Sequence, residues 1–486
     1  MELKKFKFNL TTLGTLALAT LVSSNALATR YDYSSEVTSN LSDLVIVPYY
    51  TTRDSWTTGL HIRNNSDETQ VIKFRLRRGT DSADVMDINL VLSPRDVWAA
   101  NINDDNKEGI VTLTTTDNSC TVPVVEPDSK GVRSFQVPSL GREASQEGYI
   151  EVIGMGSADS DQYISKNALH GENGQPLSCS EVEENFYAKN VLSNSKTVAK
   201  DSEGVSQTSY YGDTGNVLTV SFFIRNEADG TEMGDNATHI KNFAKAPMMT
   251  NQQFGIGSGD FAGFDFPDLD GGGANGAPRG LFDEKVRKVL SVKTLANDWS
   301  FNTQNGVSTA WVINFPGQYL MRPSDFLKKD DSTNEEPENY SDLPVDVLLS
   351  VYDREEATPV DDSKLVISPA QELPNQLLFP YEANIVLWKN GVAPAVNSLD
   401  SINITTIEPG LDSDYGWAVM SFVTDNSNEQ RIYDHTDPTG ESYKVAKYGI
   451  PVLGFIAWNR TFADPNKNYG RMVGHTTTTE TYRRPQ

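Results

Sequence analysis

The chain has 486 residues, with 66 acidic and 41 basic side chains and a formal net charge of −25 at pH 7. Its length suffices for several domains with a sizeable hydrophobic core. So negative a chain repels nucleic acid and anionic lipid, which argues against both as partners.

The N-terminal segment has the pattern of a secretory signal peptide. Lys4, Lys5 and Lys7 form a basic start, residues 10–22 are uncharged and rich in Leu, Ala and Thr, and residues 26–28 read Ala-Leu-Ala. Together these features predict a cleaved leader over residues 1–28. No other stretch reaches the roughly 18 uncharged apolar residues of a membrane helix, so we expect an exported protein without a membrane span.

After the leader, apolar and polar residues alternate along many segments. Ile72, Phe74 and Leu76 alternate with Lys73, Arg75 and Arg77; the alternation recurs at 88–92, 218–224, 311–315, 345–351, 402–404 and 417–423. A period of two bounded by Gly, Pro, Asn or Asp indicates half-buried strands. We therefore predict an all-β protein of several antiparallel β-sandwich domains, immunoglobulin-like in strand spacing, with long polar loops.

Changes in composition along the chain suggest a division into domains. Residues 157–215 are polar, and residues 328–343 contain almost no apolar side chains. The predicted order is a signal peptide (1–28), a β-sandwich (29–156), a polar insert (157–215), a second β region (216–327), a linker or exposed loop (328–343) and a C-terminal β domain (344–486). Residues 60–64 and 222–226 resemble each other, either as the same strand-to-turn step in two related sandwiches or by chance.

Cys120 and Cys179 are the two cysteines of the chain. In an exported protein they meet oxidising conditions, which predicts a Cys120–Cys179 disulfide that ties the polar insert to the first sheet. Closing a loop of about 60 residues stabilises a fold by about 4 kcal/mol in the chain-entropy model. Two free thiols or two metal ligands are the alternatives, and a metal site is disfavoured because no cluster of histidines lies nearby.

Lys73, Arg75, Arg77 and Arg78 form a basic stripe on this acidic chain. As one face of a strand, the stripe could contact the acidic surface of a neighbouring copy, and such a head-to-tail contact propagates into a ring or an open array. The alternative is a solvated face balanced by acidic residues of the same chain.

Signals of catalysis are scarce. There is no nucleophile elbow, and the five histidines, His61, His170, His239, His435 and His475, are scattered along the chain. We therefore predict that the protein is not an enzyme, although a hydrolase dyad assembled from distant residues stays open.

One acidic loop suggests a metal ion. Asp265, Asp268 and Asp270 precede three consecutive glycines, and carboxylates on a flexible loop suit Ca²⁺. The spacing is not that of an EF-hand, and a solvated acidic loop is the alternative.

Several segments, taken in order, resemble a family of exported proteins of marine gammaproteobacteria. They are LVIVPYYTTRDSWTTGLHIRN (44–64), INLVLSPRDVWAANI (88–102), DNSCTVP (117–123), EGYIEVIGMG (147–156), WVINFPGQYL (311–320) and YGIPVLGFIAWNRTFADPNKNYG (448–470). Members of that family are surface-layer and biofilm-matrix proteins, with no catalytic motif to carry over. The resemblance implies identical subunits that form a two-dimensional lattice on the outer surface of a Gram-negative cell.

The resemblance does not identify what attaches the lattice to the cell, and other functions stay open. Cations could bridge the subunits to lipopolysaccharide, and the terminal Arg471, Arg483 and Arg484 could contact sugar phosphates, although a disordered tail is preferred there. The alternative function is a secreted carbohydrate-binding module or adhesin. Its candidate aromatic residues are Tyr49, Tyr50, Trp56 and Trp388, most of which we expect in the core. An outer-membrane porin would need more regular ten-residue strands.

Overall fold

The computed structural model describes residues 36–38, 41–104, 109–136, 142–187, 211–243, 291–317, 345–359, 365–368, 375–389, 399–422 and 450–478, with 247, 269, 286, 289–290, 434–436 and 442–444. The predicted signal peptide (1–28) and linker (328–343) lie outside these residues. Within them, the regular structure consists of strands, three short α-helices and brief 3-10 turns, which confirms the predicted all-β class. The helices are α2 (Arg142–Ser145), α3 (Tyr163–Ala168) and α4 (Cys179–Tyr187).

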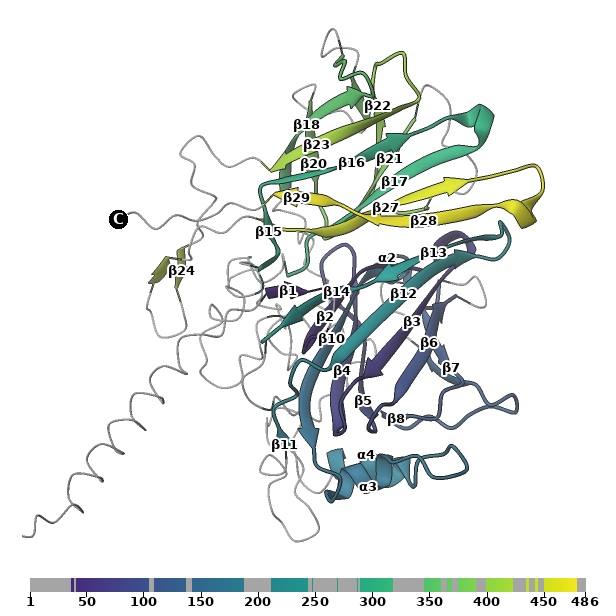
Figure 1. Cartoon of the computed structure of the whole chain (residues 1–486), viewed down its shortest axis with the longest axis vertical. Helices are drawn as coiled ribbons and strands as arrows, with labels where there is room; N and C mark the ends of the chain where they lie inside the picture. Colours follow the sequence, from purple (N-terminus) through teal and green to yellow (C-terminus); the bar gives the residue numbers. More distant parts are fainter. Residues whose placement is uncertain are drawn as a thin grey trace, which may run out of the picture.

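Two sheets form a first sandwich (Figure 1). In spatial order, sheet 1 contains β1 (Glu36–Thr38), β14 (Thr238–Lys241), β2 (Leu44–Thr51), β10 (Glu147–Ala158), β4 (Thr69–Arg78), β5 (Asp84–Leu92) and β8 (Cys120–Val122), and β11 (Tyr211–Gly212) pairs with β10. Sheet 2 contains β13 (Thr231–Asn236), β12 (Leu218–Asn226), β3 (Trp56–Asn64), β6 (Val97–Asn103), β7 (Thr112–Thr115) and β9 (Arg133–Gln136). Their facing side chains share one core, in which the rings of Phe74 and Trp98 meet edge to face at 5.6 Å.

Two further sheets form a second sandwich. Sheet 3 contains β20 (Gln376–Phe379), β18 (Val345–Asp353), β23 (Tyr415–Phe422), β16 (Thr294–Ser300) and β29 (Thr476–Thr478). Sheet 4 contains β19 (Val366–Ser368), β22 (Ile404–Glu408), β21 (Ala383–Trp388), β17 (Val307–Asn314), β27 (Leu453–Arg460) and β28 (Tyr469–Gly474). Two small ladders complete the pairing, β15 (Ser291–Val292) with β26 (Ile450–Pro451) and β24 (Asp434–Thr436) with β25 (Ser442–Lys444). Stacked tryptophans, Trp299 and Trp388 at 5.6 Å, fill the core between sheets 3 and 4.

The structure divides the predicted second β region of residues 216–327. Strands β12, β13 and β14 complete the first sandwich, whereas β16 and β17 open the second. Composition cannot show this division, because strands of both sandwiches alternate in the same way. The internal echo has a related explanation: residues 60–64 and 222–226 belong to β3 and β12, which are antiparallel neighbours within sheet 2.

The central strands of sheet 4, β17 and β21, are buried on both faces, which joins the two sandwiches. Trp311 and Ile313 of β17 point into the core of the second sandwich, whereas Ala310 and Val312 of the same strand pack against the first. The rings of Phe222 in β12 and Phe455 in β27 lie 6.0 Å apart across this junction. Figure 1 shows β28 running beside β13 there. One continuous apolar core therefore crosses from one sandwich to the other.

A histidine links sheets 3 and 4 at the β28–β29 crossover. The Nε2 of His475 lies 2.9 Å from the carbonyl oxygen of Val312, and its Nδ1 lies 3.1 Å from the side-chain amide of Asn297. Nε2 therefore donates to the carbonyl and Nδ1 accepts from the amide, which is the arrangement of a neutral imidazole. Burial lowers the pKa of His475 to about 4, against 6.5 for a free histidine.

This pKa shift predicts how stability depends on pH. Between pH 6.5 and 4 the unfolded chain binds a proton at His475 that the folded chain excludes, so this histidine removes stability as the pH falls through that range. The loss from this group is at most about 3.5 kcal/mol, at about 1.4 kcal/mol per pKa unit. In urea unfolding series at pH 7 and pH 4, His475→Gln should reduce the difference between the two pH values. An unchanged difference would contradict the prediction.

Candidate functional site

The basic stripe predicted to contact another copy lies inside the first sandwich. Lys73, Arg75 and Arg77 have no exposed surface, and Arg78 is buried as well. Both the exposed lattice contact and the solvated face are therefore wrong. The reason is that β4 is buried on both faces: Phe74 faces sheet 2, and the charged residues on the other face of the same strand are buried as well.

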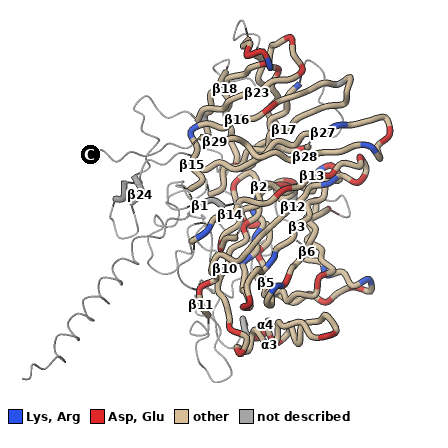
Figure 2. The backbone as a smooth tube through the Cα atoms, viewed as in Figure 1, with Lys and Arg blue, Asp and Glu red and all other residues tan. Residues whose placement is uncertain are grey.

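The buried cations are neutralised by acidic side chains of neighbouring strands. Arg75 stands directly between Asp87 of β5 and Glu151 of β10, its cross-strand partners on either side. Its guanidinium lies 3.0 Å from the Asp87 carboxylate and 3.3 Å from that of Glu151. Figure 2 shows basic and acidic positions meeting along these strands. The stripe thus pairs within the chain, as the alternative interpretation expected, but in the interior.

The remaining pairs close the network around Arg75. Lys73 Nζ lies 2.8 Å from Asp87, while Arg77 lies 3.0 Å from Asp84 and 3.1 Å from Glu151. In the contacts among described residues, three cations (Lys73, Arg75 and Arg77) therefore face three carboxylates (Asp84, Asp87 and Glu151), all of them buried. Balanced pairing is what makes burial of these charges tolerable, because an unpaired buried charge is strongly destabilising. Arg78 pairs separately with Asp81, at 2.9 Å.

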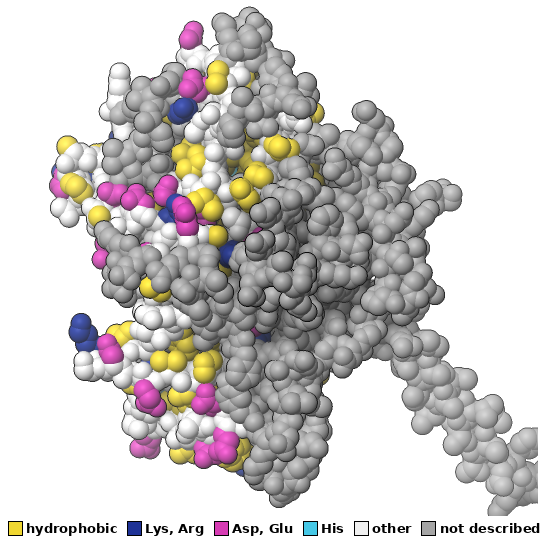
Figure 3. Space-filling model, turned by 180° about the vertical axis from the view of Figure 1, so that it is seen from behind, with side chains coloured by type: hydrophobic (Ala, Val, Ile, Leu, Met, Phe, Trp, Pro, Cys, Tyr) yellow, Lys and Arg dark blue, Asp and Glu magenta, His cyan; other side chains and the backbone are white. Residues whose placement is uncertain are grey.

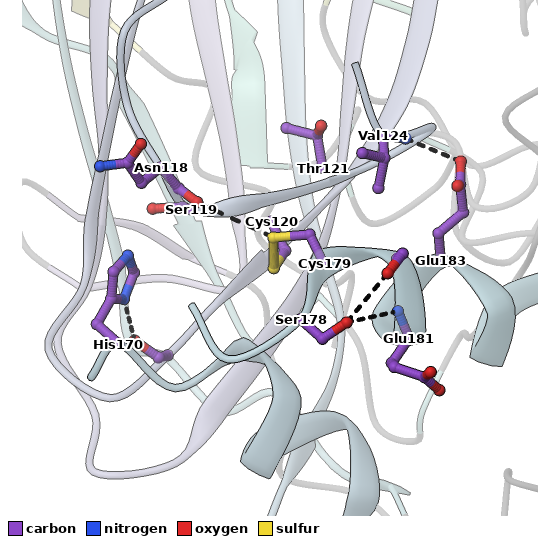
Figure 4. The surroundings of a disulfide bond; sticks show 12 residues. Asn118, Ser119, Cys120, Thr121, Val124, His170, Ser178, Cys179, Glu181 and Glu183 are labelled. Atoms are coloured by element: carbon purple, nitrogen blue, oxygen red, sulfur yellow. Dashed lines mark hydrogen bonds between the residues drawn. A yellow bond between two sulfur atoms is a disulfide. The ribbon is translucent and has the colours of Figure 1, made fainter. Parts of the chain in front are cut away.

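The predicted disulfide is confirmed and fastens one cover of this charged face. Cys120 in β8 is bonded to Cys179 at the start of α4 (Figure 4). Ile164 and Ala168 of α3 and Val182 of α4 pack on Val71 and Val91, which share the outer face of sheet 1 with the ion network. Helices α3 and α4 of the insert therefore form a lid over the sheet, whereas residues 157–158 and 211–212 belong to the sheet itself, in β10 and β11.

Ser93, Asp96 and His170, beside this lid, resemble a catalytic triad in composition but not in geometry. The Nδ1 of His170 lies 3.1 Å from Ser93 Oγ and 3.8 Å from the carboxylate of Asp96. In a triad, one imidazole nitrogen faces the nucleophile and the other faces the acid. Here the same nitrogen faces both.

The hydrogen bonds of Asp96 fix the local backbone. Its carboxylate accepts from Ser119 Oγ at 3.0 Å and from its neighbour's backbone amide, that of Val97, at 2.8 Å. Burial raises the pKa of Asp96, and His170 opposes that shift. These contacts are typical of a structural cluster that secures the loop ends beneath the disulfide.

A second buried carboxylate lies at the junction of the sandwiches. Glu147 accepts from the Tyr49 hydroxyl at 2.9 Å and from the backbone amide of Ile402 at 2.9 Å. Burial raises the pKa of Glu147. Beside it, Arg53 of the first sandwich pairs with Asp400 of the second at 3.3 Å. These polar contacts hold the 400–402 loop of the second sandwich in register on the first.

The other predicted site residues divide into two groups. Asp265, Asp268 and Asp270, the candidate calcium ligands, lie outside the described residues. Tyr49, Tyr50, Trp56 and Trp388 are all buried, as expected for most of them, so they offer no sugar-binding surface. Among the described residues, no cluster of three or more His, Cys, Asp or Glu could hold a metal ion.

What sequence reasoning missed is an apolar outer face on sheet 3. Trp417 and Val419 of β23, Tyr352 and Leu348 of β18, Ala296 of β16 and Leu378 of β20 all point away from the core and are partly or well exposed. Trp417 and Leu348 are each 38 % exposed, and the Trp417 ring stacks on Tyr352 at 4.4 Å. The sequence did contain a signal for this face. In β18 and β23, apolar residues occur at both odd and even positions, whereas an alternating pattern places the apolar residues of a strand on one face only.

Comparisons with known proteins identify no relative: no family model, curated protein or solved structure matches the chain. In the part of the chain that the structure describes, no helix has the length and apolar character needed to cross a membrane.

The ion network predicts a large cost for removing one carboxylate. Glu151→Gln removes one of the two carboxylates that Arg75 and Arg77 share, the other being Asp84, and breaking a buried pair costs about 3 to 5 kcal/mol. Asp67→Asn is the matched control, because Asp67 pairs with Arg95 at the surface, where a pair contributes less than about 1 kcal/mol. Urea unfolding at pH 7 measures both. Equal losses of stability in the two variants would contradict a structural role for the network.

Proposed function

We propose that the chain is a structural protein of the cell exterior whose copies associate with one another into an extended assembly. The observation that carries the proposal is the apolar outer face of sheet 3. Exposed apolar patches of this kind mark surfaces that bind other proteins. Apolar side chains of four strands contribute to the face, and Asp298, opposite Trp417, adds a carboxylate beside it.

Three further features support an extracellular structural role. A disulfide persists in oxidising compartments, which suits export. The continuous core across sheet 4 makes the two sandwiches one stiff body, which suits a repeating subunit. The buried ion network and the Ser93–Asp96–His170 cluster are engaged in internal contacts, which favours a protein without catalytic activity.

The acidic surface favours assembly that depends on divalent cations. The chain carries 25 more negative than positive charges, and Figure 3 shows acidic and hydrophobic side chains interspersed over the described part of one face, with few basic ones. Screening by salt and bridging by cations both reduce the repulsion between such surfaces. A surface layer with calcium between its subunits is the specific form that the sequence resemblance suggests.

The test is the assembly state of the purified full chain. We expect sheets or large oligomers in negative-stain electron microscopy and sedimentation velocity with millimolar Ca²⁺, and smaller species with a chelator. A chain that stays monomeric at high concentration in calcium and high salt would overturn the proposal, as would hydrolase activity that Ser93→Ala abolishes.

A variant pair tests the outer face of sheet 3. Leu348→Glu places a carboxylate in the apolar face, and burying it unpaired in an interface costs at least about 2 kcal/mol, so the concentration needed for assembly should rise more than about tenfold. Leu177→Glu is the control, because Leu177 is 73 % exposed and lies between α3 and α4, far from sheet 3 in the fold. Equal effects of the two substitutions would exclude this face as the contact.

A further inference from the structure

The β27–β28 hairpin presents a row of alternating arginine and aromatic side chains. Trp458 and Arg460 of β27 lie opposite Arg471 and Tyr469 of β28, respectively, and Phe462 lies two residues after the end of β27. Arg471 is thus part of a strand rather than of a disordered tail. Cross-strand partners share one face of a sheet, so the side chains stand together in a row, which we call the arginine–aromatic row.

The members of the arginine–aromatic row are in contact with one another. The guanidinium carbon of Arg471 lies 4.8 Å from the centre of the Trp458 ring, and that of Arg460 lies 5.0 Å from the Phe462 ring. Tyr469 lies between them, with its ring 5.6 Å from Trp458 and 6.2 Å from Phe462. Phe462 and Tyr469 nevertheless remain 39 % and 44 % exposed. The row is therefore ordered and still open to solvent.

Among the described surface arginines, some pair with a carboxylate and others do not; the two arginines of the row belong to the second group, as does Arg354, which rests on the Tyr415 ring. Arg53, Arg95 and Arg225 each have a carboxylate within ion-pair distance. Among the described residues, no carboxylate lies within that distance of Arg460 or Arg471; each rests on an aromatic ring. Within the same part of the chain, the Nε of Arg460 is buried and has no hydrogen-bond acceptor. On a chain with a net charge of −25, two guanidinium groups without acidic partners indicate a site for an anion.

We propose that the arginine–aromatic row binds an anionic polysaccharide. Each guanidinium presents a planar fork of N–H donors that pairs with a carboxylate or sulfate group of the chain. The exposed rings of Phe462 and Tyr469 offer apolar surfaces to the C–H faces of the intervening sugars. Arginine and sugar contacts alternate along the row, as acidic and neutral groups alternate along such a polymer.

A polysaccharide fits this row better than a second copy of the chain does. A stable protein interface needs about 20 to 30 residues on each side, whereas the row offers five side chains along two strands. It fits better than nucleic acid, too. Duplex DNA carries one charge per about 1.7 Å, and so dense an array of phosphates would be repelled by the rest of this acidic surface.

The experiment measures binding of the full chain to polysaccharides, at protein concentrations below assembly. Fluorescently labelled alginate, which carries carboxylates, and dextran sulfate are the anionic probes, with neutral dextran and a single-stranded oligonucleotide beside them. We expect binding to one or both anionic polymers that weakens with salt, and little binding to dextran or to the oligonucleotide. Comparing alginate with dextran sulfate tells which anion the arginines prefer.

Variants of the row test its role. Arg471→Gln and Arg460→Gln should each lower the affinity about tenfold and reduce its salt dependence, because each removes one charge-assisted contact. Phe462→Ala should lower it severalfold with the salt dependence unchanged. Arg95→Gln is the control: 61 % of the Arg95 side chain is accessible, but Arg95 pairs with Asp67, so this variant should bind as the unaltered chain does. Unfolding midpoints verify that every variant is folded.

Four outcomes would overturn the proposal: equal affinity in all folded variants, an equal loss in Arg95→Gln, tighter binding of neutral dextran, or tighter binding of the oligonucleotide. If the row variants instead change the sedimentation of the chain and leave polysaccharide binding intact, the row is a contact between copies. None of these results depends on the outer face of sheet 3, so this proposal and that of assembly can fail separately.

Discussion

Burial of both faces of a sheet is the constraint on which the rest of this structure depends. The central strands of sheets 1 and 4 are covered on two sides, so every residue of a strand such as β4 or β17 must be acceptable in an interior. In strand β17, apolar residues occupy both odd and even positions at its centre, so both faces suit an interior. Strand β4 meets the same demand with Lys73, Arg75 and Arg77, whose charges are balanced by acids of β5 and β10. The two solutions are not equivalent, because a charged layer requires a specific register whereas an apolar layer does not.

In this arrangement, the contacts that stabilise the fold lie apart from the surfaces for which we propose partners. The strongest ion pairs, the disulfide and the triad-like cluster all fix the first sandwich, and Glu147 with Arg53 fixes its junction with the second. What remains for interaction with other molecules lies on the second sandwich: an apolar sheet face and a row of arginines held on aromatic rings. The first sandwich with its lid is thus the more closed of the two, and the second carries the surfaces for which we propose partners.

Much of the fold could be predicted from the sequence. Alternation identified the strands and the all-β class, and the presence of two cysteines in a chain predicted to be exported identified the disulfide. The alternation failed at Lys73, Arg75 and Arg77, because a period of two shows that two faces differ and does not show that the charged face is wet. The acids that neutralise it, Asp87 and Glu151, belong to strands whose pairing no local pattern reveals.

The candidate surfaces were missed because apolar residues that suit a core were found at the surface. Trp417 and Tyr469 were each compatible with a core position, and only the layer order of the sheets shows that they face outward. The assignment of residues 216–327 to one region failed in the same way, since chain order does not reveal which sheet a strand joins. Long-range pairing, rather than local preference, decides each of these cases.

The lid fastened by Cys120 and Cys179 has a consequence for the timing of folding. It covers the end of sheet 1 beside the charged layer, where exclusion of water matters most for the strength of the ion pairs. A chain with reduced thiols lacks this fastening, so its charged layer stays more accessible to water and its first sandwich less firmly closed. Completion of the native state is thereby coupled to oxidation of the two thiols.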